Sequence, residues 1–398
     1  MATNEELKTL LVIGNGFDLA HGLQTRYTDF LNFINLRIET HIKEIVDKQM
    51  VKRDALFDNA KPSEAIQITE ENKKFRKQLR ENYFREVDNN RENFDLLHKR
   101  REEIQKKIFK TSLTFENILD YVFNFGNIWI GHFNKCRENK FNRIGEDWID
   151  FEKEIESVIK NIEKLISGEK INEPPDQFIL QDYDRISPQL IIQKYIPIMD
   201  WDLKILTLLL EGYLIDEEKI FQSKQVPFFK NLNPEAVISY NYTHIFQKLY
   251  DAETKTPVHF IHGELGKHNL VLGIGETLPD DQKDNLTVCA SFKKFFQIIK
   301  CRLGNQYKNI TKFKGEYIFW EVIIYGHSLD STDIDSLRWL MSNSTTQNPA
   351  LHPIKKISIY YYDENSYNQQ IANAIQIIGK DELIEAVNSE RIVFLPIQ

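Results

Sequence analysis

The sequence predicts an α/β protein with a Rossmann-like, doubly wound and mainly parallel sheet, interrupted by a large, mostly α-helical insertion. Short apolar runs alternate with helical patterns towards both ends of the chain, a Gly-x-Gly turn follows the first apolar run, and no convincing strand pattern occurs within residues 35–224. Parallel strands need crossover connections, so this alternation favours a parallel sheet. We expect residues 1–34 and 225–398 to form the α/β domain and residues 35–224 to form the insertion.

The first strand is predicted at residues 10–13, which read Leu-Leu-Val-Ile. A strand covered on both faces needs no polar alternation, so this run is typical of the centre of a parallel sheet. Gly14 and Gly16 follow it, and glycine lets a ligand approach the backbone closely enough for the turn to cradle a phosphate. Leu19 stands at the third glycine position of the dinucleotide fingerprint, so an ordinary tight turn is the alternative interpretation.

A helix is predicted next, with Thr28 as its N-cap and with apolar residues at helical spacing from Phe30 to Ile45. Inside the expected insertion, residues 52–110 interleave charges of both signs, which favours a solvated helix face over a nucleic-acid patch. Further helices are predicted at residues 113–134, 147–166 and 188–214, and a loop at residues 167–187. The aromatic residues of 115–133 are expected to pack a helical core, with a protein interface as the alternative.

The pattern returns to strands and helices after residue 235. Strands are predicted at residues 236–240, 259–262, 270–274, 318–325, 356–362 and 391–395. Helices are predicted at residues 289–303 and from Asp333 onward. In doubly wound sheets ligands bind at the carboxyl ends of the strands, so the residues that follow these runs are the candidates for a site.

Composition excludes several classes of function. The chain has 398 residues, enough for two domains, and its net charge of −8 argues against a general nucleic-acid binder. Its three cysteines are far apart, which provides neither a disulfide framework nor a four-cysteine zinc site. No run of 18 apolar residues is present, and the first residues are acidic where a signal peptide is basic. We expect a cytoplasmic protein without membrane or nucleic-acid partners.

Unusual polar residues follow four of the predicted strands, at residues 14–18, 241–243, 262–263 and 326–330. Each group has an ordinary explanation, because Asn and Gly form turns and Asp18 and Asp333 could cap helices. Their placement at the ends of four strands of one sheet favours a shared site.

Two resemblances connect these residues to known families. Residues 12–23, Val-Ile-Gly-Asn-Gly-Phe-Asp-Leu-Ala-His-Gly-Leu, resemble the opening motif of the AbiH family of bacterial phage abortive-infection proteins, and residues 148–152 resemble its internal Trp-x-x-x-Glu signature. The carboxyl half resembles sirtuin-type domains. Residues 238–243 resemble their strand-end Asn motif, residues 261–263 their His-Gly, and residues 325–333 the Gly-x-Ser-Leu stretch of bacterial sirtuin-like defence proteins.

The sirtuin-type resemblance implies a site for NAD and cleavage of its nicotinamide–ribose bond. Gly14 and Gly16 would approach the pyrophosphate, and Asn241 would bind the nicotinamide ribose or orient a water. His262 would act as base or bind a ribose hydroxyl, and Ser328 would line the adenosine side. The other residues that the resemblance assigns to NAD binding are Asn15, Phe17, Asp18, Thr243, Gly326 and Asp330.

The chain departs from the sirtuin pattern at several positions. The four cysteines of the sirtuin zinc module are absent, which argues against protein deacetylation, and Thr243 stands where sirtuin-type motifs usually carry Asp. His259 and His262 alternate along a predicted strand and therefore face opposite sides, while His244 and His268 lack partners at ligand spacing. We therefore expect no catalytic metal.

Three hypotheses for function follow. The first is an NAD glycohydrolase of anti-phage defence, forming a homo-oligomer and acting with a phage trigger or a defence partner protein. The second is a non-catalytic sensor that binds NAD, ADP-ribose or a related nucleotide and signals through the helical insertion. The third is a structural partner of another defence protein. Polar residues gathered at a cleft are only probabilistic evidence of catalysis, so all three hypotheses stay open at this point.

Overall fold

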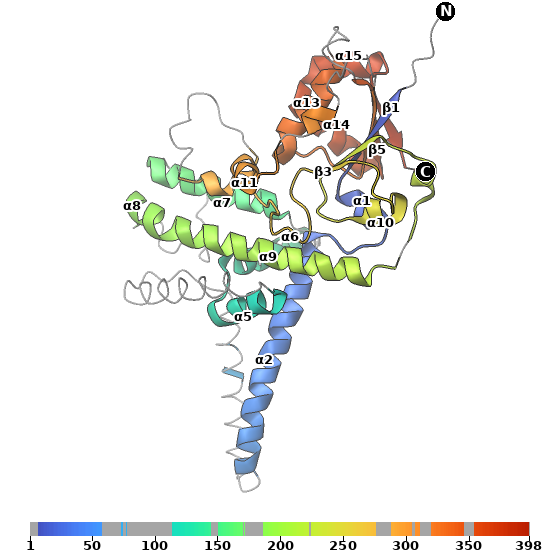
Figure 1. The fold of residues 1–398 in the computed structure, drawn as a ribbon. Coiled ribbons are helices and arrows are strands. Elements are labelled where there is room, and N and C mark those ends of the chain that lie inside the picture. Colours follow the sequence, from blue (N-terminus) through green and yellow to red (C-terminus); the bar gives the residue numbers. More distant parts are fainter. Residues whose placement is uncertain are drawn as a thin grey trace, which may run out of the picture. The chain divides into compact units, whose positions relative to one another are not determined.

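The computed structural model resolves two compact units. Its described residues are 7–57, 73–74, 77, 114–144, 150–169, 171, 186–222, 224–275, 288–304, 307–310, 320–345 and 354–397 (Figure 1). The α/β unit contains residues 1–25, 214–284 and 290–398, and the helical unit contains residues 26–213 and 285–289. Among the described residues, no helix combines the length and apolar character that crossing a membrane requires.

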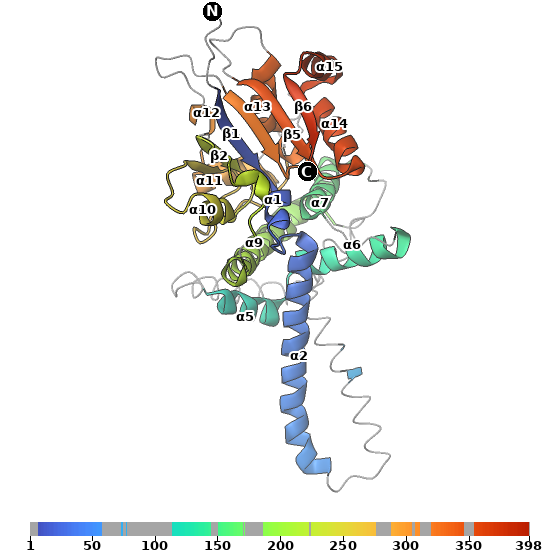
Figure 2. The same cartoon turned by 90° about the vertical axis from the view of Figure 1, so that its right-hand side faces the viewer.

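The α/β unit is built on a single six-stranded sheet (Figure 2). Its strands are β1 (Lys8–Ile13), β2 (Ala236–Ser239), β3 (Val258–Phe260), β4 (Trp320–Tyr325), β5 (Ile354–Tyr361) and β6 (Ile392–Pro396). They lie in the order β3-β2-β1-β4-β5-β6, and every neighbouring pair is parallel. The α/β class and the parallel sheet are thus confirmed. The order reverses at β1, and open sheets bind ligands beside such a reversal.

Both faces of the sheet are buried, which explains the uninterrupted apolar run of β1. On one face, Leu10 and Val12 belong to a core cluster with residues of α13 (Ile334–Thr345), α14 (Glu364–Ile378) and α15 (Lys380–Asn388). On the other face, Leu11 and Ile13 pack with residues of α1 (Asn15–Ala20), the 3-10 turn η3 (Pro227–Phe229) and α10 (Ile245–Tyr250). All four β1 side chains are at most 1% exposed, so neither face tolerates a polar residue there.

One predicted strand is wrong. Residues 270–274 form no strand; only Ile274 makes an isolated bridge, to Lys293. The side-chain amide of Gln297 takes the place of a neighbouring strand, because it donates to the carbonyl of Leu272 at 3.0 Å and accepts from the N–H of Leu272 at 3.0 Å. The segment is therefore buried and apolar, as a strand would be. The backbone of Leu272 is satisfied by a side chain from α11 (Lys294–Cys301), while the N–H groups of Val271 and Ile274 donate to carbonyls outside the sheet.

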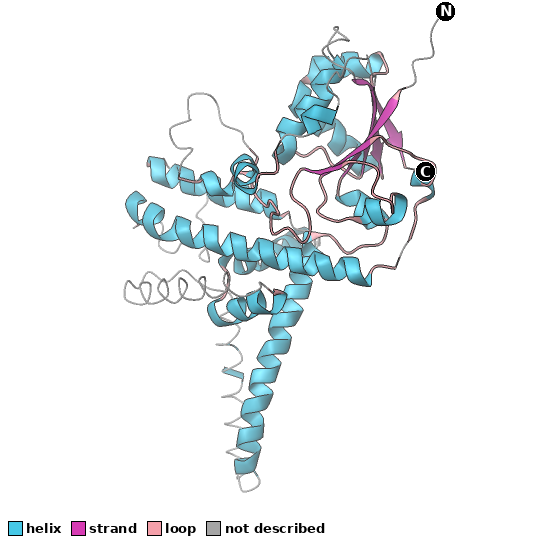
Figure 3. Ribbon diagram, viewed as in Figure 1, coloured by secondary structure: helices cyan, strands magenta, loops and turns pink. Residues whose placement is uncertain are grey.

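The helical unit contains no strand among its described residues (Figure 3). Its helices are α2 (Tyr27–Phe57), α5 (Phe115–Phe125), α6 (Ile128–Ile144), α7 (Phe151–Ser167), α8 (Pro188–Leu190), the π-helical turn η2 (Ile191–Tyr195) and α9 (Ile196–Ile220), whose last residues from Leu214 belong to the α/β unit. Tyr121, Trp129 and Phe133 are at most 2% exposed, so this aromatic stretch packs a core as predicted. Most of residues 52–110, Trp148 and most of the predicted loop at 167–187 lie outside the described residues.

Candidate functional site

The glycine loop after β1 packs directly against the chain that follows β4. The N–H of Gly14 donates to the carbonyl of Tyr325 at 3.1 Å, and the N–H of Gly16 donates to the carbonyl of Gly326 at 2.8 Å. A Cβ on Gly14 would lie 2.7 Å from the Gly326 carbonyl oxygen, and a Cβ on Gly16 would lie 2.6 Å from the Gly326 Cα. Backbone-to-backbone packing therefore requires glycine here, and these two N–H groups are bonded within the protein.

The neighbouring residues of the loop also have partners inside the fold. Phe17 is fully buried, and its ring lies 4.9 Å from Phe229, edge to face. Asn15 accepts a hydrogen bond from the Thr25 hydroxyl at 2.6 Å. Asp18 lies within α1, whose N-cap is Gly14, so the interpretation of Asp18 as a helix cap is wrong.

Asp18 instead forms a buried polar network with the end of β2. Its Oδ2 accepts from the Thr243 hydroxyl at 2.7 Å, and its Oδ1 makes no hydrogen bond with the described residues. Asn241 donates through Nδ2 to the carbonyl of Gly14 at 2.9 Å. Burial raises the pKa of Asp18 to about 7, although the hydrogen bond from Thr243 acts in the opposite direction. This network ties β2 to the glycine loop through a carboxyl group that titrates near neutrality.

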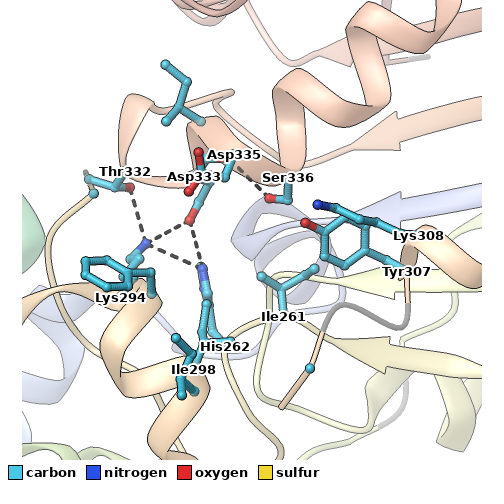
Figure 4. A pocket seen from close by; sticks show the side chains of 15 residues that line it. Ile261, His262, Lys294, Ile298, Tyr307, Lys308, Thr332, Asp333, Asp335 and Ser336 are labelled. Carbon is cyan, nitrogen blue, oxygen red and sulfur yellow. Dashed lines mark hydrogen bonds and ion pairs between the residues drawn. The ribbon is translucent and has the colours of Figure 1, made fainter. Parts of the chain in front are cut away.

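A second polar cluster lies between the segments that follow β3 and β4, with Asp333 at its centre (Figure 4). Asp333 Oδ1 lies 2.8 Å from Nε2 of His262 and 2.8 Å from Nζ of Lys294, and its Oδ2 lies 3.4 Å from Nε2 of His327. The four side chains are between 5% and 9% exposed. The Asp333 carboxylate therefore joins three buried basic groups, and the residue that caps the 3-10 turn η6 (Ser331–Asp333) is Asp330.

Burial and neighbouring charges set the protonation of this cluster. Burial lowers the pKa of His262, and the Lys294 ammonium lowers it further. Burial alone would raise the pKa of Asp333, but Lys294 and His262 hold it well below its usual range. At neutral pH the cluster thus contains a Lys294–Asp333 ion pair beside a neutral His262. With Nε2–H of His262 donating to Asp333, Nδ1 is the ring nitrogen that can accept a proton.

The ring of His327 is held by the backbone of Leu329, two residues further along the chain. Its Nδ1 accepts from the N–H of Leu329 at 2.9 Å, which leaves the proton on Nε2, facing Asp333. This contact stabilises a turn in which Leu329 has a φ of +58°, a left-handed conformation that a leucine rarely adopts.

A cavity of about 320 Å³ opens beside the cluster. Its wall includes His262, Lys294 and Asp333, together with Tyr307 and Lys308 of α12 (Tyr307–Ile310), as Figure 4 shows. Apolar side chains complete it, among them Ile261, Ile298 and Ile334. Its size suits a small molecule or part of a larger ligand, and its position at the carboxyl edge of the sheet is typical of ligand sites in open α/β folds.

The predicted site residues thus separate into groups. His262 lines the cavity. The predicted residues Asn241, Thr243 and Asp18 instead form the buried network with the glycine loop. The remaining predicted residues lie in the turn after β4. Ser328 is exposed, and its carbonyl accepts a hydrogen bond from Asn373 at 2.8 Å. Asp330 caps a 3-10 turn, because its side chain accepts from the N–H of Thr332 at 3.1 Å.

Sequence reasoning missed Lys294 and Tyr307 as lining residues. Lys294 is the first residue of α11, where a lysine is normally solvated, so its residue type does not indicate a buried site residue. His327 stood inside a motif that had been singled out, and its position next to Gly326 at a strand end could have indicated it.

Comparison with known protein families identifies a match over most of the chain. The family model described as Bacteriophage abortive infection AbiH matches residues 10–351, whereas no curated protein and no solved structure shows a significant similarity to the chain. The matched range covers most of the 398 residues, including the glycine loop, the network around Asp18 and the whole wall of the cavity. The resemblance seen in the opening motif is confirmed, and the chain belongs to the AbiH family of bacteriophage abortive-infection proteins.

Proposed function

We propose that this AbiH protein acts in phage defence by hydrolysing NAD at its nicotinamide–ribose bond, with His262 as the general base. The observation that carries the proposal is the neutral His262, held by Asp333 at 2.8 Å, in the wall of a cavity at the carboxyl edge of a parallel sheet. The strand order supports it, because doubly wound dinucleotide-binding sheets share the order β3-β2-β1-β4-β5-β6.

The proposed reaction needs little acid catalysis. The bond between C1′ of the ribose and the pyridinium nitrogen breaks, nicotinamide leaves with the electron pair as a neutral molecule, and the ribose carbon becomes oxocarbenium-like. A water adds to C1′ and gives up one proton. The products are nicotinamide, ADP-ribose and that proton, so the enzyme must hold the ribose and place a base beside the water.

The residues of the cluster suit these requirements. Nδ1 of neutral His262 would take the proton of the water, and the Asp333 carboxylate would stabilise the imidazolium that forms. Lys294 would act as a positioning residue, because its charge balances Asp333 and keeps His262 unprotonated beforehand. Lys308 is exposed beside the cavity, where its ammonium would meet the pyrophosphate. In this proposal Asn241 supports the glycine loop rather than contacting the ribose.

A non-catalytic nucleotide sensor is the second candidate, and one observation favours it. The N–H groups of Gly14 and Gly16 are bonded to Tyr325 and Gly326, so this loop offers them to a pyrophosphate only if those bonds break. A ligand smaller than a dinucleotide would fill the cavity without needing that loop. Such a protein would bind a nucleotide without a pyrophosphate, or ADP-ribose with its pyrophosphate outside that loop, and leave it intact.

The test is the NAD content of a bacterial host that the protein protects from phage, together with the products formed by the purified chain. We expect nicotinamide and ADP-ribose from the wild type during infection and a loss of at least about 100-fold in rate for His262→Ala. The matched control is His268→Asn, since His268 is exposed and its φ of +52° suits asparagine. Binding of NAD or ADP-ribose without turnover would identify a sensor. Binding of neither nucleotide, together with no turnover during protection, would refute both candidates.

A further inference from the structure

The helical unit brings together three side chains of different ligand chemistry. His132 and Cys136 lie four residues apart on α6 and therefore share one face of that helix. Glu154 comes from α7. Cys136 Sγ lies 3.5 Å from Nε2 of His132 and 3.4 Å from Oε2 of Glu154, and one ligand atom from each residue lies within 4.8 Å of the other two.

Rigid packing holds these three residues in place. Phe133, next to His132, stacks on Phe151 of α7 with ring centroids 3.9 Å apart and planes 11° from parallel. Phe151 and Phe133 are both fully buried, and Glu154 lies one helical turn after Phe151. Trp129 packs edge to face against the ring of His132 and is itself fixed by a hydrogen bond to the Met199 carbonyl at 2.9 Å. The cluster thus belongs to the core of the unit.

We propose that His132, Cys136 and Glu154 bind a Zn²⁺ ion, with a water as the fourth ligand. Zinc bonds of about 2.3 Å to sulfur and about 2.0–2.1 Å to nitrogen or oxygen, in tetrahedral geometry, place a sulfur about 3.5 Å from its neighbouring ligand atoms. The two sulfur separations match this value. The third separation, between the ligand atoms of His132 and Glu154, is at most 4.8 Å, so side-chain adjustments can complete the site.

The donor set selects the metal. One sulfur, one imidazole nitrogen and one carboxylate oxygen are ligands that zinc accepts together, whereas Mg²⁺ and Ca²⁺ require oxygen ligands. A thiolate, a carboxylate and a neutral imidazole also balance the two positive charges of the ion. His132 is 6% exposed and the other two residues are half-buried, which leaves a side of the site open to water.

The ordinary explanation of the cluster is a protonated thiol that donates to Glu154 beside the imidazole. The two explanations differ in the state of the sulfur, because zinc requires a thiolate and releases the thiol proton when it binds. A measurement that reports a metal–sulfur bond therefore separates them, whatever the stability of the variants.

The experiment uses the purified full-length protein after removal of metals by a chelator. Zn²⁺ content is measured by mass spectrometry after dialysis against Zn²⁺, and Co²⁺ is added to a second sample as a spectroscopic probe. We expect one bound metal per chain and, with Co²⁺, a thiolate-to-cobalt charge-transfer band with tetrahedral d–d bands. Cys136→Ser should abolish the charge-transfer band and weaken metal binding by at least about 100-fold.

Matched controls are available within the same chain. Cys301→Ser changes another half-buried cysteine, in the α/β unit, and should leave both the band and the affinity unchanged. Glu154→Gln and His132→Ala should weaken binding while the charge-transfer band of Cys136 stays detectable at high Co²⁺. The proposal is overturned if the wild type takes up no metal, if Co²⁺ binds without the charge-transfer band, or if Cys136→Ser binds as tightly as the wild type.

Discussion

Replacing Lys294 by methionine tests the charge balance of the cavity cluster. The substitution keeps most of the volume of the side chain and removes an ammonium group that lies 2.8 Å from the Asp333 carboxylate, in a position where both side chains are below 10% exposed. Removing one partner of a buried ion pair typically costs about 3–5 kcal/mol, since the remaining charge is buried without compensation. We expect a loss of this size in the free energy of unfolding at alkaline pH.

The loss should shrink as the pH falls, because His262 can replace the missing charge. Burial and Lys294 both lower the pKa of His262, and Asp333 raises it. Without Lys294 the unpaired carboxylate acts against burial alone, and we expect it to raise the pKa of His262 above its unfolded value of about 6.5, so that protonated His262 pairs with Asp333. A raised histidine pKa adds stability that is fully present below about pH 6.5 and is lost as the pH rises through the folded value. The variant should therefore approach wild-type stability near about pH 5 and fall furthest behind near about pH 8.5.

Urea unfolding followed by circular dichroism at the two pH values measures this difference. The control is the double variant Lys294→Met with Asp333→Asn, which leaves no buried charge and should recover most of the loss at alkaline pH. An equal destabilisation of Lys294→Met at both pH values, or a double variant that is no more stable than the single one, would refute the assignment of Lys294 and Asp333 as an ion pair beside a neutral His262.

Two further predictions concern the glycine loop and the network behind it. A pKa raised from 3.8 to about 7 means that ionising Asp18 costs about 4 kcal/mol more in the folded protein than in the unfolded chain. The contribution of this group to the free energy of unfolding should therefore be largest below about pH 4 and should decline as the pH rises towards 7. Asp18→Asn should remove that decline in urea titrations, and an unchanged pH profile would contradict the raised pKa. Gly16→Ala should destabilise the protein by about 1–3 kcal/mol, because the new methyl group meets the Gly326 Cα at 2.6 Å, and thermal unfolding measures the loss. The control Gly266→Asn has open space at a φ of +78°, and a Gly16→Ala variant as stable as this control would contradict the packing.

The sheet was predictable wherever its strands are apolar on both faces. The runs at β1 and β4 indicate central strands because a parallel sheet buries both faces, and both lie in the middle of the observed sheet. The run at 270–274 carries the same pattern although it is a buried loop, in which Gln297 bonds the backbone of Leu272 and carbonyls outside the sheet accept from Val271 and Ile274. Periodicity reports burial, and it cannot report which group accepts the backbone hydrogen bonds.

The candidate site was predictable only in part, because its residues depend on contacts between distant segments. His262 was found through its place after a strand, but the fold alone pairs it with Asp333, which lies 71 residues further along the chain. Lys294 has no sequence signal, since a lysine at the start of a helix is ordinarily exposed. The prediction that Asp18 caps a helix is wrong because α1 begins three residues before it, at Asn15.

The glycines of the opening motif show how a family motif can have a structural cause. Gly14 and Gly16 lie where a phosphate-binding turn would have them, yet each is in close backbone contact with the chain at Gly326, whose own φ of +69° favours glycine. A Cβ on any of the three would meet backbone atoms within 2.7 Å. The two motifs, more than three hundred residues apart in sequence, are therefore one packing unit at the point where the strand order reverses. A substitution in either motif acts on both strand ends, so loss of function in a glycine variant is evidence for a ligand contact only if the variant keeps wild-type stability.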